Sequence, residues 1–148
     1  MDSTVMQILK EKGSQVWSVK PDTPVFDTLR VLSEKDIGAV VVVNDEGKLV
    51  GIFSERDYVR QAVKDIETIK HRPVSEFMTR NVVTIRPEET VKDCMLMMTA
   101  HHIRHLPVVE NEKLVGIITI GDVVKQVISD QSKLLEEMEN YISGRYNR

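Results

Sequence analysis

The chain contains 148 residues, of which 41% are hydrophobic and 29% charged, and its formal net charge is -3. A chain of this size and composition can bury a core, which excludes a disordered protein, and its single cysteine excludes an internal disulfide framework. The mild negative charge makes nucleic acid an unexpected partner. No apolar run approaches the ~18 residues of a membrane span, and segment 1–4 is too polar for a secretory signal, so we expect a cytoplasmic protein with no membrane partner.

The first predicted element is a short helix within residues 3–12. Val5, Ile8 and Leu9 fall on one face of this helix, and Gly13 is a suitable stop signal. This segment precedes the repeated part of the chain and is expected to flank it.

The rest of the chain contains an internal repeat, which constrains the architecture more strongly than local propensities do. Residues 16–43 match residues 82–109 at an offset of 66, and residues 49–57 match residues 114–122 at an offset of 65. The one-residue difference falls in a polar turn between two apolar runs, where length changes are tolerated. The sequence therefore predicts two copies of one structural unit.

Each copy is expected to run as strand, helix, strand, tight turn, strand and helix. In the first copy, Val25, Leu29 and Leu32 recur at helical spacing, and Thr23 is the expected N-cap of that helix. The uninterrupted β-branched run 40–43 predicts a short strand covered on both faces.

The second copy repeats these signals after a linker in which Pro73 interrupts any helix. The apolar stripe recurs within 91–98, and Thr90 with Asp93 forms a capping pair at the start of that helix. Pro107 must then lie at the start or the edge of the second copy's middle strand.

After Asp122 a helical seam continues well past the second copy, stepping by four and three residues. The seam consists of Val124, Ile128, Gln131, Leu135, Met138 and Ile142. Such a seam is expected to pack on its own domain or on a sister subunit, with a dedicated target-binding helix as the alternative.

These elements predict an α+β fold, in which two β-α-β-β-α repeats are related by pseudo-two-fold symmetry and flanked by terminal helices. The predicted parts are an N-terminal helical segment 1–15, a first repeat 16–66, a linker 67–80, a second repeat 81–128 and a C-terminal helical extension 129–148.

The most informative local motif is Ser54-x-x-Asp57, which recurs as Thr119-x-x-Asp122. Each motif follows a Leu-Val-Gly-Ile strand and opens a helix, whose N-terminus offers unpaired N–H groups to a phosphate. The hydroxyl and carboxylate could bind a ribose diol, but the same spacing is that of a capping box, which only satisfies the helix. The motif alone leaves both functions open.

Two further features are not required by helix capping. A hydroxyl stands three residues before the proline of the first strand in each copy, at Ser18 and Thr84. Segments 37–40 and 103–106 supply apolar and backbone groups at the edge of the middle strand, of the kind that can sandwich a flat base. These features favour a nucleotide site in each copy.

On these motifs the chain resembles a tandem pair of CBS domains, the regulatory adenosine-nucleotide-binding unit often called a Bateman module. The resemblance covers most of the chain, and its specificity lies in the ordered set of motifs occurring twice. The segments that carry it are 19–23, 37–43, 49–57, 85–90, 103–109 and 114–122, with the linker segment 74–79.

The resemblance implies clefts between the copies, with the ribose held by Asp57 in one and by Asp122 in the other. It implies hydroxyl contacts from Ser18, Ser54, Thr84 and Thr119, and base-edge contacts from Gly38, Ala39, Val40, Arg104, His105, Leu106 and Pro107. Arg56 is the expected phosphate ligand of the first copy, and Gly121 takes its place in the second. The two clefts should therefore treat phosphorylated ligands differently.

The implied ligand is an adenosine nucleotide, AMP or ATP foremost. NAD(H) and S-adenosylmethionine are alternatives, because all of these compounds share the adenosine half. The implied function is regulatory, in energy or redox sensing and signal transduction, with a homodimer acting in trans on an unknown protein target. A ligand-free dimerisation or scaffold module is the alternative.

The sequence predicts neither an enzyme nor a metal site, since it contains no Gly-rich phosphate loop and no assembled nucleophile and base. His101 and His105 have helical spacing, but the helix should stop before Ile103, and no further Cys/His pair completes four zinc ligands. Residues 101–105 are either a basic patch near phosphate or solvated loop residues. Cys94 is expected to be a small buried hydrophobe.

Overall fold

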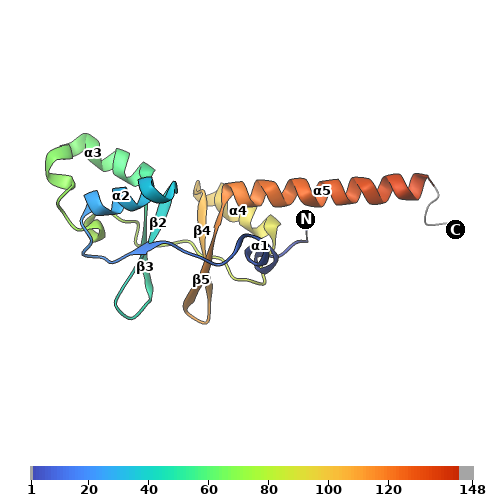
Figure 1. The fold of residues 1–148 in the computed structure, drawn as a ribbon, viewed down its shortest axis with the longest axis horizontal. Helices are drawn as coiled ribbons and strands as arrows, with labels where there is room; N and C mark the ends of the chain where they lie inside the picture. The colour runs from blue at the N-terminus through green and yellow to red at the C-terminus, as the bar shows by residue number, and fades with distance from the viewer. Residues whose placement is uncertain (1, 144–148) are drawn as a thin grey trace.

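The computed structural model describes residues 2–143 and has the expected α+β fold. Two small sheets lie side by side, with α2 and α3 beside the first and α4 and α5 beside the second (Figure 1). The elements are α1 (Val5–Lys12), β1 (Ser18–Val19), α2 (Val25–Lys35), β2 (Ala39–Val43), β3 (Leu49–Ser54), α3 (Glu55–Ile69), the 3₁₀ turn η1 (Val74–Glu76), α4 (Val91–His101), β4 (His105–Glu110), β5 (Lys113–Thr119) and α5 (Ile120–Ile142).

The two sheets share one construction. β1 pairs in parallel with β2, β2 pairs antiparallel with β3, and β4 pairs antiparallel with β5. In the second repeat Ile85 forms an isolated parallel bridge with Val108, where Val19 of β1 pairs with Val42 in the first repeat. Each of these residues lies 66 positions after its counterpart. The offset seen in the sequence is therefore also the structural offset.

Four helices in the described part of the chain begin with a capping box, and their N-cap residues are Thr4, Ser54, Thr90 and Thr119. The expected pair of Thr90 with Asp93 is confirmed. The expected Thr23 cap of α2 is wrong, because Pro24 takes the N-cap position. Thr23 Oγ1 instead accepts a hydrogen bond from Lys20 N at 3.1 Å, which closes the preceding turn.

Each repeat has its own hydrophobic core. The first-repeat core consists of Val19, Val25, Leu32, Val40, Val42, Phe53, Ile69, Val74 and Met78. The second-repeat core consists of Val5, Ile8, Leu9, Ile85, Val91, Cys94, Met98, Leu106, Val108, Ile118 and Val123. The apolar face of α1 is buried as its spacing predicts, but it is buried in the second repeat.

The segments that precede the two repeats are exchanged between them. Val5 of α1 donates its N–H to Glu89 O of the second repeat at 2.8 Å, whereas Val74 of the linker donates to Thr23 O of the first repeat at 2.8 Å. Both valines are completely buried. Figure 1 accordingly shows α1 beside the second sheet, away from the first repeat. Each repeat is completed by the segment that lies before the other.

Both exchanged segments lie very close to a strand glycine. A Cβ at Gly116 of β5 would be 2.7 Å from Leu9 Cδ2, and a Cβ at Gly51 of β3 would be 2.8 Å from Met78 Cγ. Any larger residue would push the docked segment away, because packed interiors leave no spare volume. The two glycines occupy equivalent positions in the repeat, so the same close approach is used twice.

We expect Gly116→Ala to lower the free energy of unfolding by about 1–3 kcal/mol, because Leu9 or its backbone must move. Urea denaturation measures the loss. Gly121→Ala is the matched control, since its Cβ would meet only Thr119 Oγ1 at 3.6 Å and alanine favours the helix. If Gly116→Ala were as stable as the parent chain, α1 would not be docked on β5 in solution.

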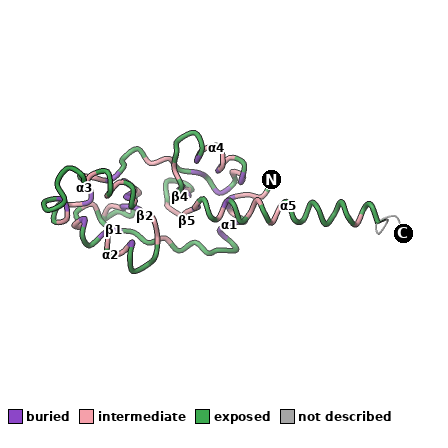
Figure 2. The backbone as a smooth tube through the Cα atoms, turned by 90° about the horizontal axis from the view of Figure 1, so that it is seen from above, coloured by how far each residue is buried: buried purple, intermediate pink, exposed green. Residues whose placement is uncertain are grey.

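α5 extends far beyond the rest of the molecule, and Figure 2 shows its outer part as exposed. From residue 131 to residue 143 every residue except Asn140 is exposed, and the seam residues Leu135 and Met138 keep 66% and 52% of their surface. The predicted long helix is confirmed as far as Ile142, but its seam does not pack on its own domain. Residues 144–148 of the predicted C-terminal extension lie outside the described residues.

Among the described helices, none combines the length and the apolar character needed to cross a membrane.

Candidate functional site

The first group of predicted site residues gathers where β2 begins and α3 starts. Ala39 of β2 pairs with Ser54, the last residue of β3 and the N-cap of α3. Gly38 O accepts a hydrogen bond from Glu55 N at 3.0 Å. Asp57 follows in the first turn of α3. A strand end, a helix N-terminus, a hydroxyl and a carboxylate therefore lie together.

The second group has the same construction one repeat later. His105 of β4 pairs with Thr119, the N-cap of α5. Arg104 O accepts a hydrogen bond from Ile120 N at 2.9 Å, and Asp122 lies in the first turn of α5. The two groups thus occupy equivalent positions in the two repeats and form equivalent hydrogen bonds.

The remaining predicted hydroxyls lie beside the middle strand of each repeat, in β1 for Ser18 and directly before an isolated bridge for Thr84. Ser18 of β1 pairs with Val41 of β2, and Thr84 directly precedes Ile85, which bridges to Val108 of β4. Both Ser18 and Thr84 are exposed. Their hydroxyls are therefore accessible to a ligand beside the middle strands.

The predicted base-edge residues divide into buried and accessible positions. The buried ones are Ala39, Val40, Leu106 and Pro107. Because the side chains of Val40 and Leu106 belong to the two cores, a ligand there would meet only backbone. Gly38, Arg104 and His105 are the base-edge positions with accessible atoms.

Both aspartates act as helix caps, and each uses only one carboxylate oxygen. Asp57 Oδ2 accepts hydrogen bonds from Ser54 N at 2.9 Å and from Ser54 Oγ at 3.0 Å, and Asp122 Oδ2 accepts one from Thr119 N at 2.8 Å. Within residues 2–143, Oδ1 of neither aspartate accepts a hydrogen bond. The capping role is confirmed, and it leaves one oxygen of each carboxylate for a ligand.

Asp122 has a cationic partner that Asp57 lacks. Lys12, the last residue of α1, places its Nζ 2.6 Å from Asp122 Oδ2 and donates to Ile117 O at 2.9 Å. Asp57 has no ion pair among the described residues. Sequence reasoning missed Lys12, because 110 residues separate it from Asp122 and no local pattern connects α1 to the second repeat.

The two groups meet at the junction between the repeats. A Cβ at Gly38 would lie 3.4 Å from His105 Cε1, so the absence of a side chain at Gly38 lets the imidazole of the other repeat approach. Arg56 Nη1 donates a hydrogen bond to His102 O at 3.5 Å. Predicted site residues from both repeats are therefore neighbours across the junction.

The surroundings of His105 favour its neutral form. Burial lowers the pKa of its imidazole below the usual range, and the charges of Arg104 and Lys12 lower it further, against the opposing effect of Glu55 and Asp122. The ring can donate or accept a hydrogen bond at the junction but adds no positive charge there.

A groove of about 510 Å³ lies between α4 and α5. It is lined mainly by apolar side chains of these helices, and its lining also includes Arg56 and Arg104. Neither aspartate lines it. The groove thus shares Arg56 and Arg104 with the predicted nucleotide sites, and it also includes Val124 and Ile128 of the α5 seam.

The histidines and the cysteine do not form a reactive centre. No three metal-ligating side chains gather within residues 2–143. α4 ends at His101 and His105 begins β4, so the two histidines do not share a helix face. Cys94 is completely buried, and burial raises its pKa to about 12, which keeps the thiol protonated at neutral pH.

Comparisons with known proteins agree with this duplicated arrangement. The family model for the CBS domain matches residues 5–64 and 74–129. CBS domain-containing protein CBSX3, mitochondrial, of Arabidopsis thaliana is 33% identical over 153 residues, covering 97% of this chain and 74% of that protein.

Two solved structures extend the comparison. The crystal structure of the CBS-domain containing protein ATU1752 from Agrobacterium tumefaciens is 41% identical, with a TM-score of 0.81 over 84% of this chain and 93% of that one. The crystal structure of CBSX2 in complex with AMP is 29% identical, with a TM-score of 0.71 over 87% of this chain and 98% of that one. The two ranges matched by the family correspond to the two repeats, and the chain belongs to the CBS domain family as a tandem pair of such domains.

Proposed function

We propose that this chain is a regulatory module that binds an adenosine nucleotide, AMP or ATP, beside Asp57 and Asp122 and acts in trans on a protein partner. The observation that carries the proposal is the duplicated group of a hydroxyl, a helix N-terminus and a carboxylate with one unused oxygen, next to the start of a middle strand. AMP in the crystal structure of CBSX2 supports adenosine as the ligand class. A cytoplasmic location stays a prediction.

Ribose binding and helix capping are compatible at these aspartates. The ribose 2′ and 3′ hydroxyls donate to the unused Oδ1, while Oδ2 keeps its bond to the N-cap amide. The base lies against the backbone at the start of the middle strand, and the helix N-terminus favours the phosphate. Because both groups border the contact of Gly38 with His105, binding biases the relative placement of the repeats, which a partner can sense.

Mass spectrometry of small molecules released from freshly purified protein tests the ligand class, and calorimetry with AMP, ATP, NAD(H) and S-adenosylmethionine ranks the candidates. We expect saturable binding of AMP or ATP and a rise in the melting temperature with nucleotide concentration. If the protein released no adenosine compound and its melting temperature did not change with any of the four ligands, it would be the ligand-free scaffold. Turnover of the nucleotide would indicate an enzyme.

Arg56→Ala should weaken AMP binding at the first cleft about tenfold or more, because a charge-assisted hydrogen bond to phosphate contributes roughly 1.5–3 kcal/mol. Adenosine binding should hardly change. The guanidinium reaches His102 O in the free protein and is exposed enough to turn toward a phosphate. Equal losses for AMP and adenosine would remove the phosphate role of Arg56.

We also propose a homodimer, because large apolar side chains remain uncovered on two helices. Val59 and Val63 of α3 are 62% and 84% exposed, and Leu135 and Met138 of α5 are 66% and 52% exposed. A chain that leaves these apolar side chains in water gains free energy when a second copy covers them.

The charges beside these apolar residues favour a head-to-tail arrangement. Arg56, Arg60 and Lys64 recur at four-residue spacing next to the exposed valines of α3, whereas Glu136 and Glu139 flank the seam of α5. Packing α5 of one copy on α3 of the other therefore joins apolar to apolar and basic to acidic surface.

A further inference from the structure

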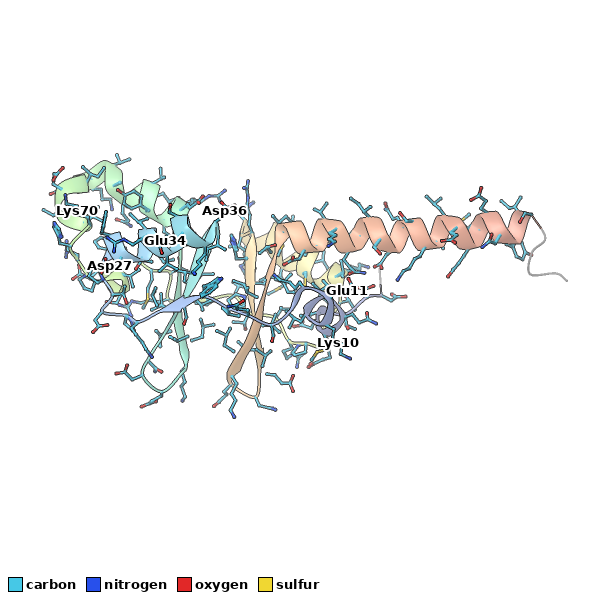
Figure 3. All side chains as sticks on the ribbon, viewed as in Figure 1. Lys10, Glu11, Asp27, Glu34, Asp36 and Lys70 are labelled. Atoms are coloured by element: carbon cyan, nitrogen blue, oxygen red, sulfur yellow. The ribbon has the colours of Figure 1, made fainter. Side chains whose placement is uncertain are left out.

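Lys12 reaches from α1 into the second predicted nucleotide site. Figure 3 labels its neighbours Lys10 and Glu11 on α1, beside the second sheet. Its ammonium binds Asp122 Oδ2 at 2.6 Å and Ile117 O at 2.9 Å, and 29% of its side chain and 20% of that of Asp122 are exposed. Both side chains of this ion pair keep part of their surface in contact with solvent, so the ammonium can exchange one anionic partner for another.

In the described part of the chain, no cation is paired with Asp57 of the first site. α1 and the linker dock equivalently, with Val5 and Val74 as counterparts, so Lys12 corresponds by the same offset to Asn81. Ile52, the counterpart of Ile117, has its carbonyl bonded to Thr79 N at 2.9 Å. The backbone of the linker thus takes the place that the Lys12 ammonium takes in the second repeat.

We propose that Lys12 makes the second cleft selective for adenosine ligands that carry a phosphate. This inference rests on the proposed function, in which Asp122 receives the ribose. The ammonium shares that carboxylate, so a ligand that enters weakens the existing ion pair. A phosphate on the same ribose offers the ammonium a replacement anion within the swing of its flexible four-carbon stem, whereas a nucleoside offers none.

Within residues 2–143, no second cation forms an ion pair with Asp122. Burial lowers the pKa of His105 and so favours the neutral imidazole, and Arg104 is exposed and lines the α4–α5 groove. The first cleft, whose expected phosphate ligand is Arg56 on α3, uses a different element for the same purpose. Selectivity at the second cleft therefore depends on how α1 is docked.

The test measures binding of AMP and of adenosine by calorimetry in the full chain carrying Asp57→Asn, which isolates the second cleft. We expect Lys12→Met to weaken AMP and to strengthen adenosine, so that the preference for AMP falls about tenfold, the usual effect of one charge-assisted hydrogen bond. Lys12→Arg should keep most of the preference. Lys10→Met, an exposed change on the same helix, should keep all of it.

The outcomes separate this inference from the proposed function. Binding of AMP with a preference that is unchanged by Lys12→Met would overturn the role of Lys12 and leave the nucleotide site intact. Binding of neither compound by the folded Asp57→Asn chain would overturn both. Circular dichroism melts establish that each variant is folded, and Lys12→Gln supplies a second neutral variant if Lys12→Met does not fold.

Discussion

The double variant Asp57→Asn with Asp122→Asn is expected to lose nucleotide binding while it remains folded. Asparagine can still offer its carbonyl oxygen to the N-cap amide, so the cap survives. The amide nitrogen then faces the ribose hydroxyls, and two donors meet. Each single change should cost about 1–3 kcal/mol, or roughly 5- to 150-fold in affinity, at one class of site. Calorimetry with AMP measures both losses.

Asp93→Asn is the matched control for this pair. Asp93 Oδ2 accepts a hydrogen bond from Thr90 N at 2.9 Å in the same capping geometry, but α4 does not start beside a middle strand. The control should lose as much cap stability as Asp57→Asn and keep full AMP affinity. If the folded double variant bound AMP as the parent chain does, both aspartates would be caps and nothing more.

The two aspartate variants should also differ in stability. Asp122→Asn breaks the ion pair with Lys12 in addition to changing the cap, so it should lower the free energy of unfolding by up to about 1 kcal/mol more than Asp57→Asn. Urea denaturation distinguishes them.

Leu135→Glu with Met138→Glu is expected to convert a homodimer into a monomer. Both side chains lie on the uncovered seam of α5, beyond the last contacts of that helix with its own domain, so the change should not disturb the fold. Burying two carboxylates in an apolar interface without partners costs several kcal/mol per ion. Light scattering at micromolar concentration should give twice the monomer mass for the parent chain and the monomer mass for the variant.

Two controls identify which surfaces meet. Lys133→Glu changes the net charge by the same two units on the opposite face of α5, and it should leave the dimer intact. Glu136→Lys with Glu139→Lys should weaken the dimer, and Arg60→Glu with Lys64→Glu should restore it if α5 packs on α3 of the partner. A parent chain that is monomeric would overturn the dimer, and failed restoration would overturn the head-to-tail arrangement.

The duplicated fold could be predicted because its signals are local and occur twice. Apolar spacing, a capping residue and a β-branched run can each be recognised from a few neighbouring residues. Because the chain is repeated, each of these signals can be checked against its equivalent in the other copy. The N-cap roles of Thr90 and Thr119 follow from this. Thr23 shows where local patterns fail, because a threonine at this position can either cap a helix or close a turn. In the structure its hydroxyl accepts a hydrogen bond from Lys20 N and closes the turn.

What the sequence did not reveal are contacts between distant segments. The docking of α1 on the second repeat follows from complementary surfaces, and Val5 and Val74 are too isolated in sequence to indicate an exchange. Lys12 is an ordinary helix-terminal lysine until α1 is placed beside Asp122. Only the structure shows that each aspartate uses one carboxylate oxygen for the cap and leaves the other free. Helix capping and ligand binding are therefore compatible at the same residue.

The exchange of segments also sets an order for biosynthesis. α1 is synthesised long before β5, the strand on which it docks, because the whole first repeat and most of the second lie between them. The apolar face of α1 therefore stays exposed until β5 has been made, a state in which chains are prone to aggregate. The earlier repeat closes as soon as residues 74–78 emerge. The later repeat needs α1 as well as β5 and the start of α5, so the proposed second cleft can form only after the chain has been made as far as Val123.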